Sequence, residues 1–150
     1  VEIVITTAII LVAVLALLEV HSLYLKVALS NGNMAKATYL AEEGIEVVRF
    51  LRDDSWTSKI ASLTNGTAYG VILSGALWQT STLTVNKFVG SFERTITLSA
   101  VSRDSNDDIV SSGGTTDPDT RLVTSSVSWL VGSATTTRSI STYITNIYDN

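Results

Sequence analysis

The feature that most constrains this chain is a continuous apolar run at its start. Residues 1–18 carry one charged side chain, Glu2, and otherwise consist of Ile, Val, Leu, Ala and two threonines. A helix that is apolar all round has to be buried on every side. The segment must therefore be covered by lipid or by other copies of the chain, and an ordinary soluble enzyme is excluded.

The run is long enough to be a membrane span. A span needs roughly 20 apolar residues, and residues 3–25 reach that length if Glu19 and His21 are accommodated within it. A secretory signal peptide is the competing interpretation, but it would begin with basic residues and end at an Ala-x-Ala-like site. Neither occurs here, so we expect this segment to be retained and any removed leader to precede Val1.

A second, amphipathic helical pattern follows the apolar run. Residues 30–33, Ser-Asn-Gly-Asn, separate the two patterns and predict a break, a bend or a locally unwound point in the helix. Apolar residues then recur at helical spacing, at Met34, Ala37, Ala41, Ile45, Val48 and Leu51. Gly44 within this helix predicts a close approach to a neighbouring element. If both halves are helical, they form a rod of about 75 Å, too long for a globule of this size to enclose, so we expect the first half to project.

Beyond residue 53 the pattern becomes that of β-structure. Alternating apolar residues predict strands over residues 69–78, 83–89, 92–103, 121–131 and 137–147. Turns are expected at residues 64–67 and at Gly132-Ser133, and a polar loop at 104–119. The buried faces are predicted to carry Ile96, Leu98 and Ala100; Val123, Val127, Trp129 and Val131; and Ile140 and Ile144. The fold class is therefore α+β: a hydrophobic helix over residues 1–29, an amphipathic helix over 30–53 and a head with an antiparallel sheet over 54–150.

Charge and composition exclude several functions. The net charge is −4, and the 10 basic residues are scattered, so no nucleic-acid surface is indicated. The chain has no cysteine, which excludes disulfide and thiolate chemistry, and its one histidine, His21, lies in the apolar segment. No phosphate loop, metal-ligand cluster or nucleophile motif is recognisable. We expect no enzymatic activity and no cofactor.

Three segments resemble the type IV pilins and their pseudopilin relatives. They are VEIVI at residues 1–5, ATYLAEEGIE at 37–46, and Trp129 followed by STYITN at 141–146. The resemblance implies that a prepilin peptidase removes a leader, that the new amine is methylated, and that subunits wait in the cytoplasmic membrane. The assembly machinery then builds them into a helical filament of identical subunits at the cell surface.

The chain departs from the family pattern at three points. The family glutamate is usually the fifth residue of the mature chain, whereas its match here is Glu2. We expect residues to be missing before Val1, although shifted processing is the alternative. The proline that commonly kinks the family helix is absent, and so is the disulfide that bounds the C-terminal region of many pilins.

Three residues are candidates for assembly contacts. A carboxylate in hydrocarbon is costly unless paired, and the resemblance implies that Glu2 pairs with the α-amine of an adjacent subunit; a place at the membrane interface is the alternative. Glu19 and Lys26 are seven residues apart, about 10 Å along a helix. If neighbouring helices are offset by that amount, Glu19 of one meets Lys26 of the next, with His21 nearby. The alternative places all three at the headgroup level.

The head offers weaker candidate sites. An oxygen-rich loop suits calcium, although a solvated acidic loop is the simpler interpretation; its members are Asp104, Asn106, Asp108, Asp117 and Asp119. Asn65-Gly66-Thr67 fits the N-glycosylation pattern, with an unmodified turn as the alternative. Three tryptophans, Trp56, Trp78 and Trp129, are expected to be core residues rather than a sugar-binding set.

The sequence therefore predicts a structural subunit that polymerises into a type IV pilus-like filament. A minor pilin or a secretion-system pseudopilin is the alternative within the family. A membrane-anchored binding module that never polymerises is the alternative from another class. Motility, adhesion, DNA uptake and secretion are not distinguished by these residues.

Overall fold

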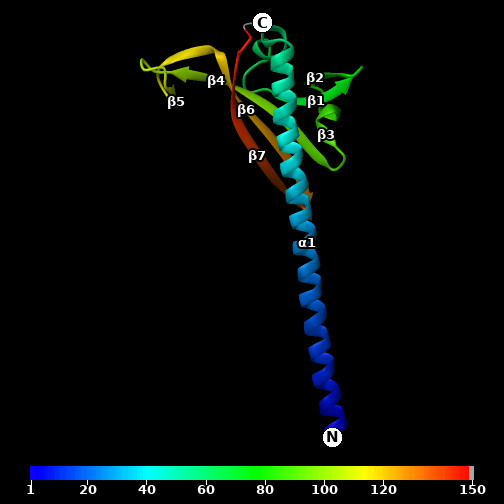
Figure 1. Ribbon diagram of the computed structural model, residues 1–150. Coiled ribbons are helices and arrows are strands. Elements are labelled where there is room, and N and C mark those ends of the chain that lie inside the picture. Colours follow the sequence, from blue (N-terminus) through cyan, green and yellow to red (C-terminus); the bar gives the residue numbers. More distant parts are fainter. Residues whose placement is uncertain (149–150) are drawn as a thin grey trace. The chain divides into compact units, whose positions relative to one another are not determined.

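The computed structural model describes residues 1–148 and divides into two compact units, one comprising Val1–Lys36 and the other beginning at Ala37. A single helix, α1, runs from Glu2 to Asp54 (Figure 1). Glu2 lies in its first turn and Arg52 in its last, and each charge opposes the helix dipole at its end. The predicted helix end near residues 53 and 54 is confirmed.

The predicted break or unwinding at residues 30–33 is wrong, because α1 is continuous through them. Serine and asparagine each cost less than about 0.7 kcal/mol in a helix relative to alanine, and Gly32 costs about 1 kcal/mol. Extending an existing helix requires no new nucleus. With no proline in the segment, the strong helix formers on both sides carry the helix across these four residues.

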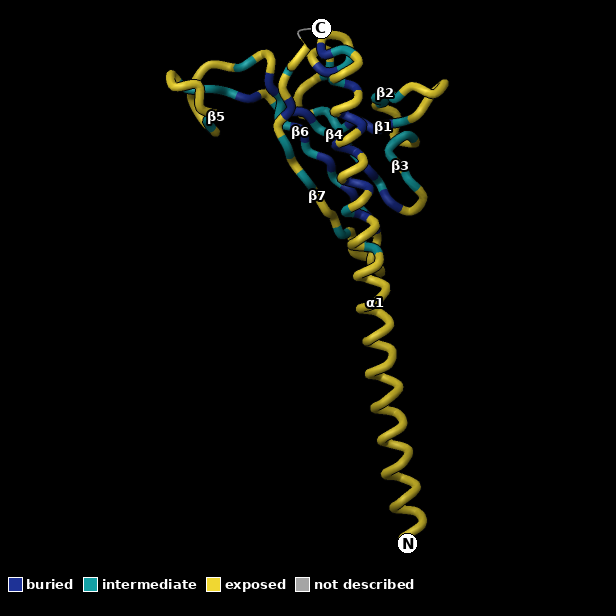
Figure 2. The backbone as a smooth tube through the Cα atoms, in the orientation of Figure 1, coloured by how far each residue is buried: buried dark blue, intermediate teal, exposed yellow. Residues whose placement is uncertain are grey.

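The first unit is an apolar helix without cover. Every residue from 1 to 32 is exposed (Figure 2). The two threonines near its start are satisfied within the helix, since Thr6 Oγ1 donates to the Glu2 carbonyl at 2.8 Å and Thr7 Oγ1 to the Ile3 carbonyl at 2.6 Å. This helix is long and apolar enough to cross a membrane by length and composition.

The second unit packs the amphipathic part of α1 against a sheet. Its buried helix residues are Ala37, Leu40, Ala41, Gly44, Ile45, Val47, Val48 and Leu51. Gly44 lies directly against the sheet: a Cβ placed there would collide with Ser125 Oγ and lie 2.9 Å from Ile96 Cδ1. The close approach predicted from this glycine is confirmed.

The sheet has seven antiparallel strands in the order β2-β1-β4-β6-β7, with β3 and β5 also paired to β4. The helix of this unit is followed by a short π-helical turn at Thr57–Ala61, and a 3-10 turn at Thr84–Lys87 precedes β3. The strands are β1 (Ala68–Ser74), β2 (Leu77–Ser81), β3 (Phe88–Val89), β4 (Phe92–Arg103), β5 (Ile109–Val110), β6 (Thr115–Val131) and β7 (Ala134–Thr145). The α+β class and the antiparallel sheet are confirmed.

Strand boundaries differ from the predictions in several places, among them the last strand, which was predicted at 137–147 and spans 134–145. The strand predicted at 69–78 is two strands, because Gly75 and Ala76 both have positive φ and form a two-residue hairpin turn. The strand predicted at 83–89 is mostly the 3-10 turn, with only β3 extended. The predicted loop at 104–119 is too long, since β6 begins at Thr115.

The residues predicted to lie on the inner faces of the strands are buried or half-buried, except at the ends of the predicted sets. In β4, Ile96 and Leu98 are buried, but Ala100 is exposed and Val101 is buried instead. The register with β6 shifts between Ala100 and Val101, and such a bulge reverses the alternation beyond it. Val131 is also exposed, because it is the last residue of β6 and lies beside the hairpin turn.

The opposite face of the central strands carries a regular array of hydroxyl groups. We call it the hydroxyl face; it comprises Thr95, Thr97 and Ser99 of β4, Thr124, Ser126 and Ser128 of β6, and Thr137, Ser139 and Ser141 of β7. Cross-strand neighbours bond to each other: Thr124 to Ser141 and Ser126 to Ser139 at 2.9 Å. All nine residues are half-buried or exposed.

Candidate assembly surfaces

Glu2 is surrounded by apolar residues. It occupies the first turn of α1 and is exposed, as are its neighbours Val1, Ile3, Val4 and Ile5. No hydrogen bond or ion pair of its side chain is found in the described part of the chain. An unpaired carboxylate in this position would be costly to enclose in apolar cover, because the cover would remove water from around it.

Glu19 and Lys26 lie on the same face of α1. They line a shallow surface hollow together with Leu15, Leu18, Ser22 and Leu23. Both side chains are exposed, and among residues 1–148 neither has a hydrogen-bond or ion-pair partner. His21 lies about 140° around the helix from Lys26 at 100° per residue, and about 160° from Glu19. The hypothesis that His21 joins this pair is therefore not supported by its direction.

Asn65 is accessible at the predicted turn. It is exposed and precedes Gly66, whose φ is +79° and whose N–H donates to the Leu98 carbonyl at 2.8 Å. The turn at 64–67 is thus confirmed, and it is fixed to β4. Glycosylation of Asn65 stays a prediction.

The acidic loop residues stabilise their own turn and strand. Asp104 Oδ1 accepts from the backbone N–H groups of Asn106 and Asp108 at 2.8 and 3.0 Å. Asp117 accepts from Arg103 Nε at 2.7 Å, and Asp119 accepts from the Asn146 amide at 3.2 Å. In the described residues no group of three His, Cys, Asp or Glu side chains is arranged to hold a metal ion.

Asp117 gives the head a specific acid sensitivity. Its hydrogen bond from Arg103, with further bonds from Thr120 and the Asp119 backbone, lowers the pKa of the carboxyl from 3.8 to about 2. A lowered pKa stabilises the fold above about pH 4, and that stabilisation is lost as pH falls from there toward 2. Asp117→Asn should therefore lower the urea midpoint at pH 7 and flatten its decline between pH 4 and 2.

Asp107 supplies the matched control for this prediction. Its carboxylate lies 3.6 Å from Arg103 Nε, but its side chain is 86% exposed against 15% for Asp117. Exposed ion pairs contribute little, so Asp107→Asn should change the urea midpoint much less at every pH. Equal effects of the two substitutions would contradict the assignment.

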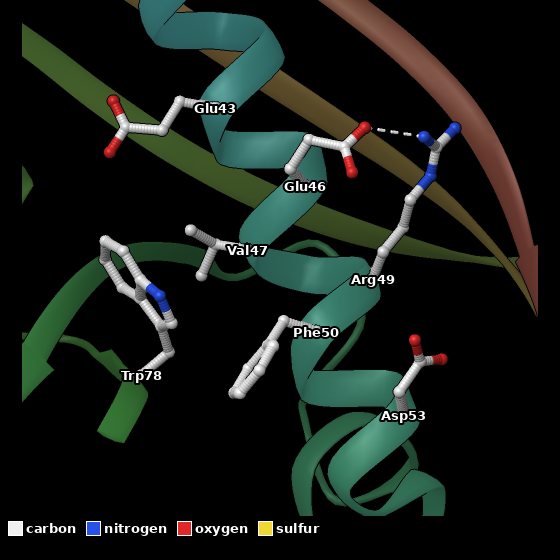
Figure 3. Close-up of a pocket in the computed structure, with 7 residues that line it drawn as sticks. All are labelled: Glu43, Glu46, Val47, Arg49, Phe50, Asp53 and Trp78. Carbon is white, nitrogen blue, oxygen red and sulfur yellow. Dashed lines mark hydrogen bonds and ion pairs between the residues drawn. The ribbon is translucent and has the colours of Figure 1, made fainter. Parts of the chain in front are cut away.

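A groove lies between the outer side of α1 and the β1–β2 hairpin. Figure 3 shows Trp78 and Phe50 on either side of Val47, with carboxylates of Glu43, Glu46 and Asp53 along the helix. Glu46 is paired with Arg49 at 2.6 Å. The groove is open and shallow, and it has none of the enclosed, convergent polar groups of a small-molecule site.

The three tryptophans do not form one binding set. Trp56 and Trp129 are buried in two different core clusters, and Trp78 packs partly against the cluster that contains Trp56. Phe92 contacts Trp129 with ring centroids 5.8 Å apart, and the Arg121 guanidinium lies 5.9 Å from the Trp56 ring centroid. The prediction that these residues are mainly core is confirmed.

Two features of the head were not predicted. Arg94 is 4% exposed; its Nη1 lies 3.1 Å from Glu43 Oε2 without hydrogen-bond alignment, and its Nη2 donates to the Val71 carbonyl at 3.4 Å. This pair joins residues far apart in sequence and has no local signal. The hydroxyl face does have one, because Thr and Ser alternate with the buried residues of β4 and β6.

Comparison with protein-family models, with curated proteins and with solved structures yields no match to this chain. The surfaces above therefore carry the functional argument. They comprise an uncovered apolar helix with Glu2 near its start, an opposite-charge pair on one helix face, and a head whose central strands present the hydroxyl face.

Proposed function

We propose that this chain is a pilin-like structural subunit that polymerises through its N-terminal helix into an extracellular filament. The observation that carries the proposal is that residues 1–32 are apolar and wholly exposed, although they belong to the same helix, α1, whose later residues form the core of the head. Exposed apolar surface of this extent needs a partner. The resemblance of residues 1–5 and 37–46 to pilins supports a partner of the same kind.

The apolar segment would have two successive environments. Lipid of the cytoplasmic membrane covers it first, and its length suits a span. In the filament, neighbouring helices replace the lipid by close van der Waals packing and by contacts between polar groups. In this role the subunit contributes contacts rather than a reaction: packing of the helices and pairing of their charges hold the filament together.

Glu2 is proposed to define which neighbour each helix pairs with. A carboxylate enclosed by apolar helices is strongly destabilising unless it has a cationic partner. The pilin resemblance supplies the α-amine of an adjacent subunit's mature chain as that partner. The pairing of these two charges then fixes the axial position of one helix relative to its neighbour, since an apolar helix surface alone specifies that position weakly.

Surface shearing tests the proposal directly. Cells expressing the full chain are sheared, and the released material is examined by electron microscopy and mass spectrometry. Filaments whose main protein is this chain are the expected result. If the chain stays wholly in the membrane fraction, as a non-polymerising membrane-anchored module would, the proposal is wrong. Filaments that contain it only as a trace component would indicate a minor pilin or pseudopilin.

A further inference from the structure

A polar stripe runs along one face of the apolar helix. Continuity of α1 through residues 30–33 places Ser30 and Asn33 on the face that carries Glu19, Ser22 and Lys26, since all five fall within about 80° of one another at 100° per residue. The stripe begins with an acid and has a base seven residues later. The rest of the first unit is mostly apolar; its other polar residues are Glu2, Thr6, Thr7, His21, Asn31 and Lys36.

Neither charge of the stripe has a partner on its own helix. Ion pairs on a helix surface form between residues three or four apart. The positions three and four residues from Glu19 are Ala16, Leu15, Ser22 and Leu23, and those from Lys26 are Leu23, Ser22, Leu29 and Ser30. Glu19 and Lys26 themselves are separated by about 10 Å along the axis, and no ion pair joins them.

We infer that the stripe is a self-complementary interface between parallel copies of this helix, offset by seven residues, in which Glu19 of one subunit pairs with Lys26 of the next. This inference rests on the proposed function and specifies its contact. Opposite charges on one face, two turns apart, fit a second copy displaced by that distance. Each copy then offers Glu19 to one neighbour and Lys26 to another, so the contact is heterologous and repeats along an assembly.

Other arrangements of two copies fit the charges less well. A parallel pair in register puts Glu19 opposite Glu19 and Lys26 opposite Lys26, and like charges at an interface are strongly unfavourable. An antiparallel pair matches the charges but requires subunits that enter the membrane in opposite directions. It also closes after two copies. Ser22, a small residue between the two charges, allows close helix approach in the offset arrangement.

Charge reversal in the full chain tests the pairing. Glu19→Lys and Lys26→Glu each place like charges at the contact, so each should reduce sheared filament by at least about tenfold. The double variant Glu19→Lys/Lys26→Glu restores opposite charges and should recover filaments. Membrane-fraction levels are measured for each variant, so that loss of insertion is separated from loss of assembly.

Disulfide trapping tests the offset while keeping both charges. The natural sequence has no cysteine, and Leu15 of one helix should lie level with Ser22 of the next. Leu15→Cys/Ser22→Cys should give a ladder of trimers and larger species on oxidation. Within one chain these positions are about 10 Å apart, too far for a disulfide. Leu17→Cys/Tyr24→Cys, with the same spacing on the opposite face, is the matched control and should give no ladder.

The outcomes separate this inference from the proposed function. Wild-type chain that makes no filaments overturns the proposed function and the inference with it. Wild-type filaments with unaffected single reversals, or with no recovery in the double reversal, overturn the inference alone and indicate charges directed to lipid headgroups. A ladder that stops at dimers, or one equally strong for the control pair, also overturns it.

Discussion

Replacing Gly44 with leucine should destabilise the head by about 3 kcal/mol or more. The reason is the contact between α1 and the sheet, where even a Cβ would collide with Ser125 Oγ and lie 2.9 Å from Ile96 Cδ1. Neither neighbour has room to move, because Ser125 and Ile96 are both fully buried. Helix propensity alone predicts the opposite sign, since most residues favour a helix more than glycine does by several tenths of a kcal/mol or more.

Alanine substitutions isolate the cause. Gly44→Ala should destabilise the head, whereas Gly32→Ala, with no atom within 4 Å of the new Cβ, should be neutral or slightly stabilising. Ser125 Oγ has no hydrogen-bond partner in the described chain, so Gly44→Ala/Ser125→Gly should recover part of the loss. Urea unfolding of the detergent-solubilised full chain, followed by the fluorescence of buried Trp56 and Trp129, measures each effect. Equal behaviour of the two alanine variants would contradict the close-contact explanation.

Glu2→Ala should reduce filament yield by at least about tenfold while leaving the head folded and the chain in the membrane. Under the proposed function, the substitution leaves the partner amine without its counter-charge inside an apolar assembly, and breaking such a pair costs several kcal/mol. Each factor of ten in yield corresponds to about 1.4 kcal/mol. Sheared protein per unit of membrane protein is the measurement.

Glu42→Ala is the control for this substitution. Glu42 is exposed on the amphipathic part of α1, so the same change of charge there should leave the filament yield within about twofold, in keeping with the small contribution of exposed charges. Normal filaments from Glu2→Ala would show that this carboxylate is not needed for assembly. Loss of the urea-unfolding transition in the variant would instead point to a folding defect.

The sequence predicts the regular elements of this chain well, because periodicity follows from which face is buried. The boundaries of β4 and the end of α1 agree with the predictions. The β1–β2 hairpin was missed because its two-residue turn pairs Gly75 with Ala76 at φ +66°, a conformation that alanine seldom adopts. Gly75 was therefore the one signal of the turn. The bulge after Ala100 depends on how β4 and β6 pair, which one strand's sequence does not contain.

Some features of the candidate assembly residues can likewise be seen in the sequence, and others only in the folded chain. Glu2, Glu19 and Lys26 stand out in the sequence because charges are rare in an apolar segment. The stripe extends to Ser30 and Asn33 because α1 does not break at residues 30–33. The low helix propensities of these residues predicted a break, so the sequence alone did not show the extension. The Arg94–Glu43 pair is a long-range contact between β4 and α1, so it becomes visible only when the helix is placed on the sheet.

The hydroxyl face affects how contacts between the head and another surface depend on salt concentration. Its nine residues are neutral, so contacts made through them alone have no counter-ions to release and are not screened by dissolved salt. The charge of Glu93, which pairs with Ser128 at one end of this face, lies outside that set. Such contacts should depend on the fit between hydroxyl groups and bound water, and should persist over a wide range of ionic strength. The charged stripe of α1 responds differently, because its pairing strengthens when lipid or protein excludes water and salt from it.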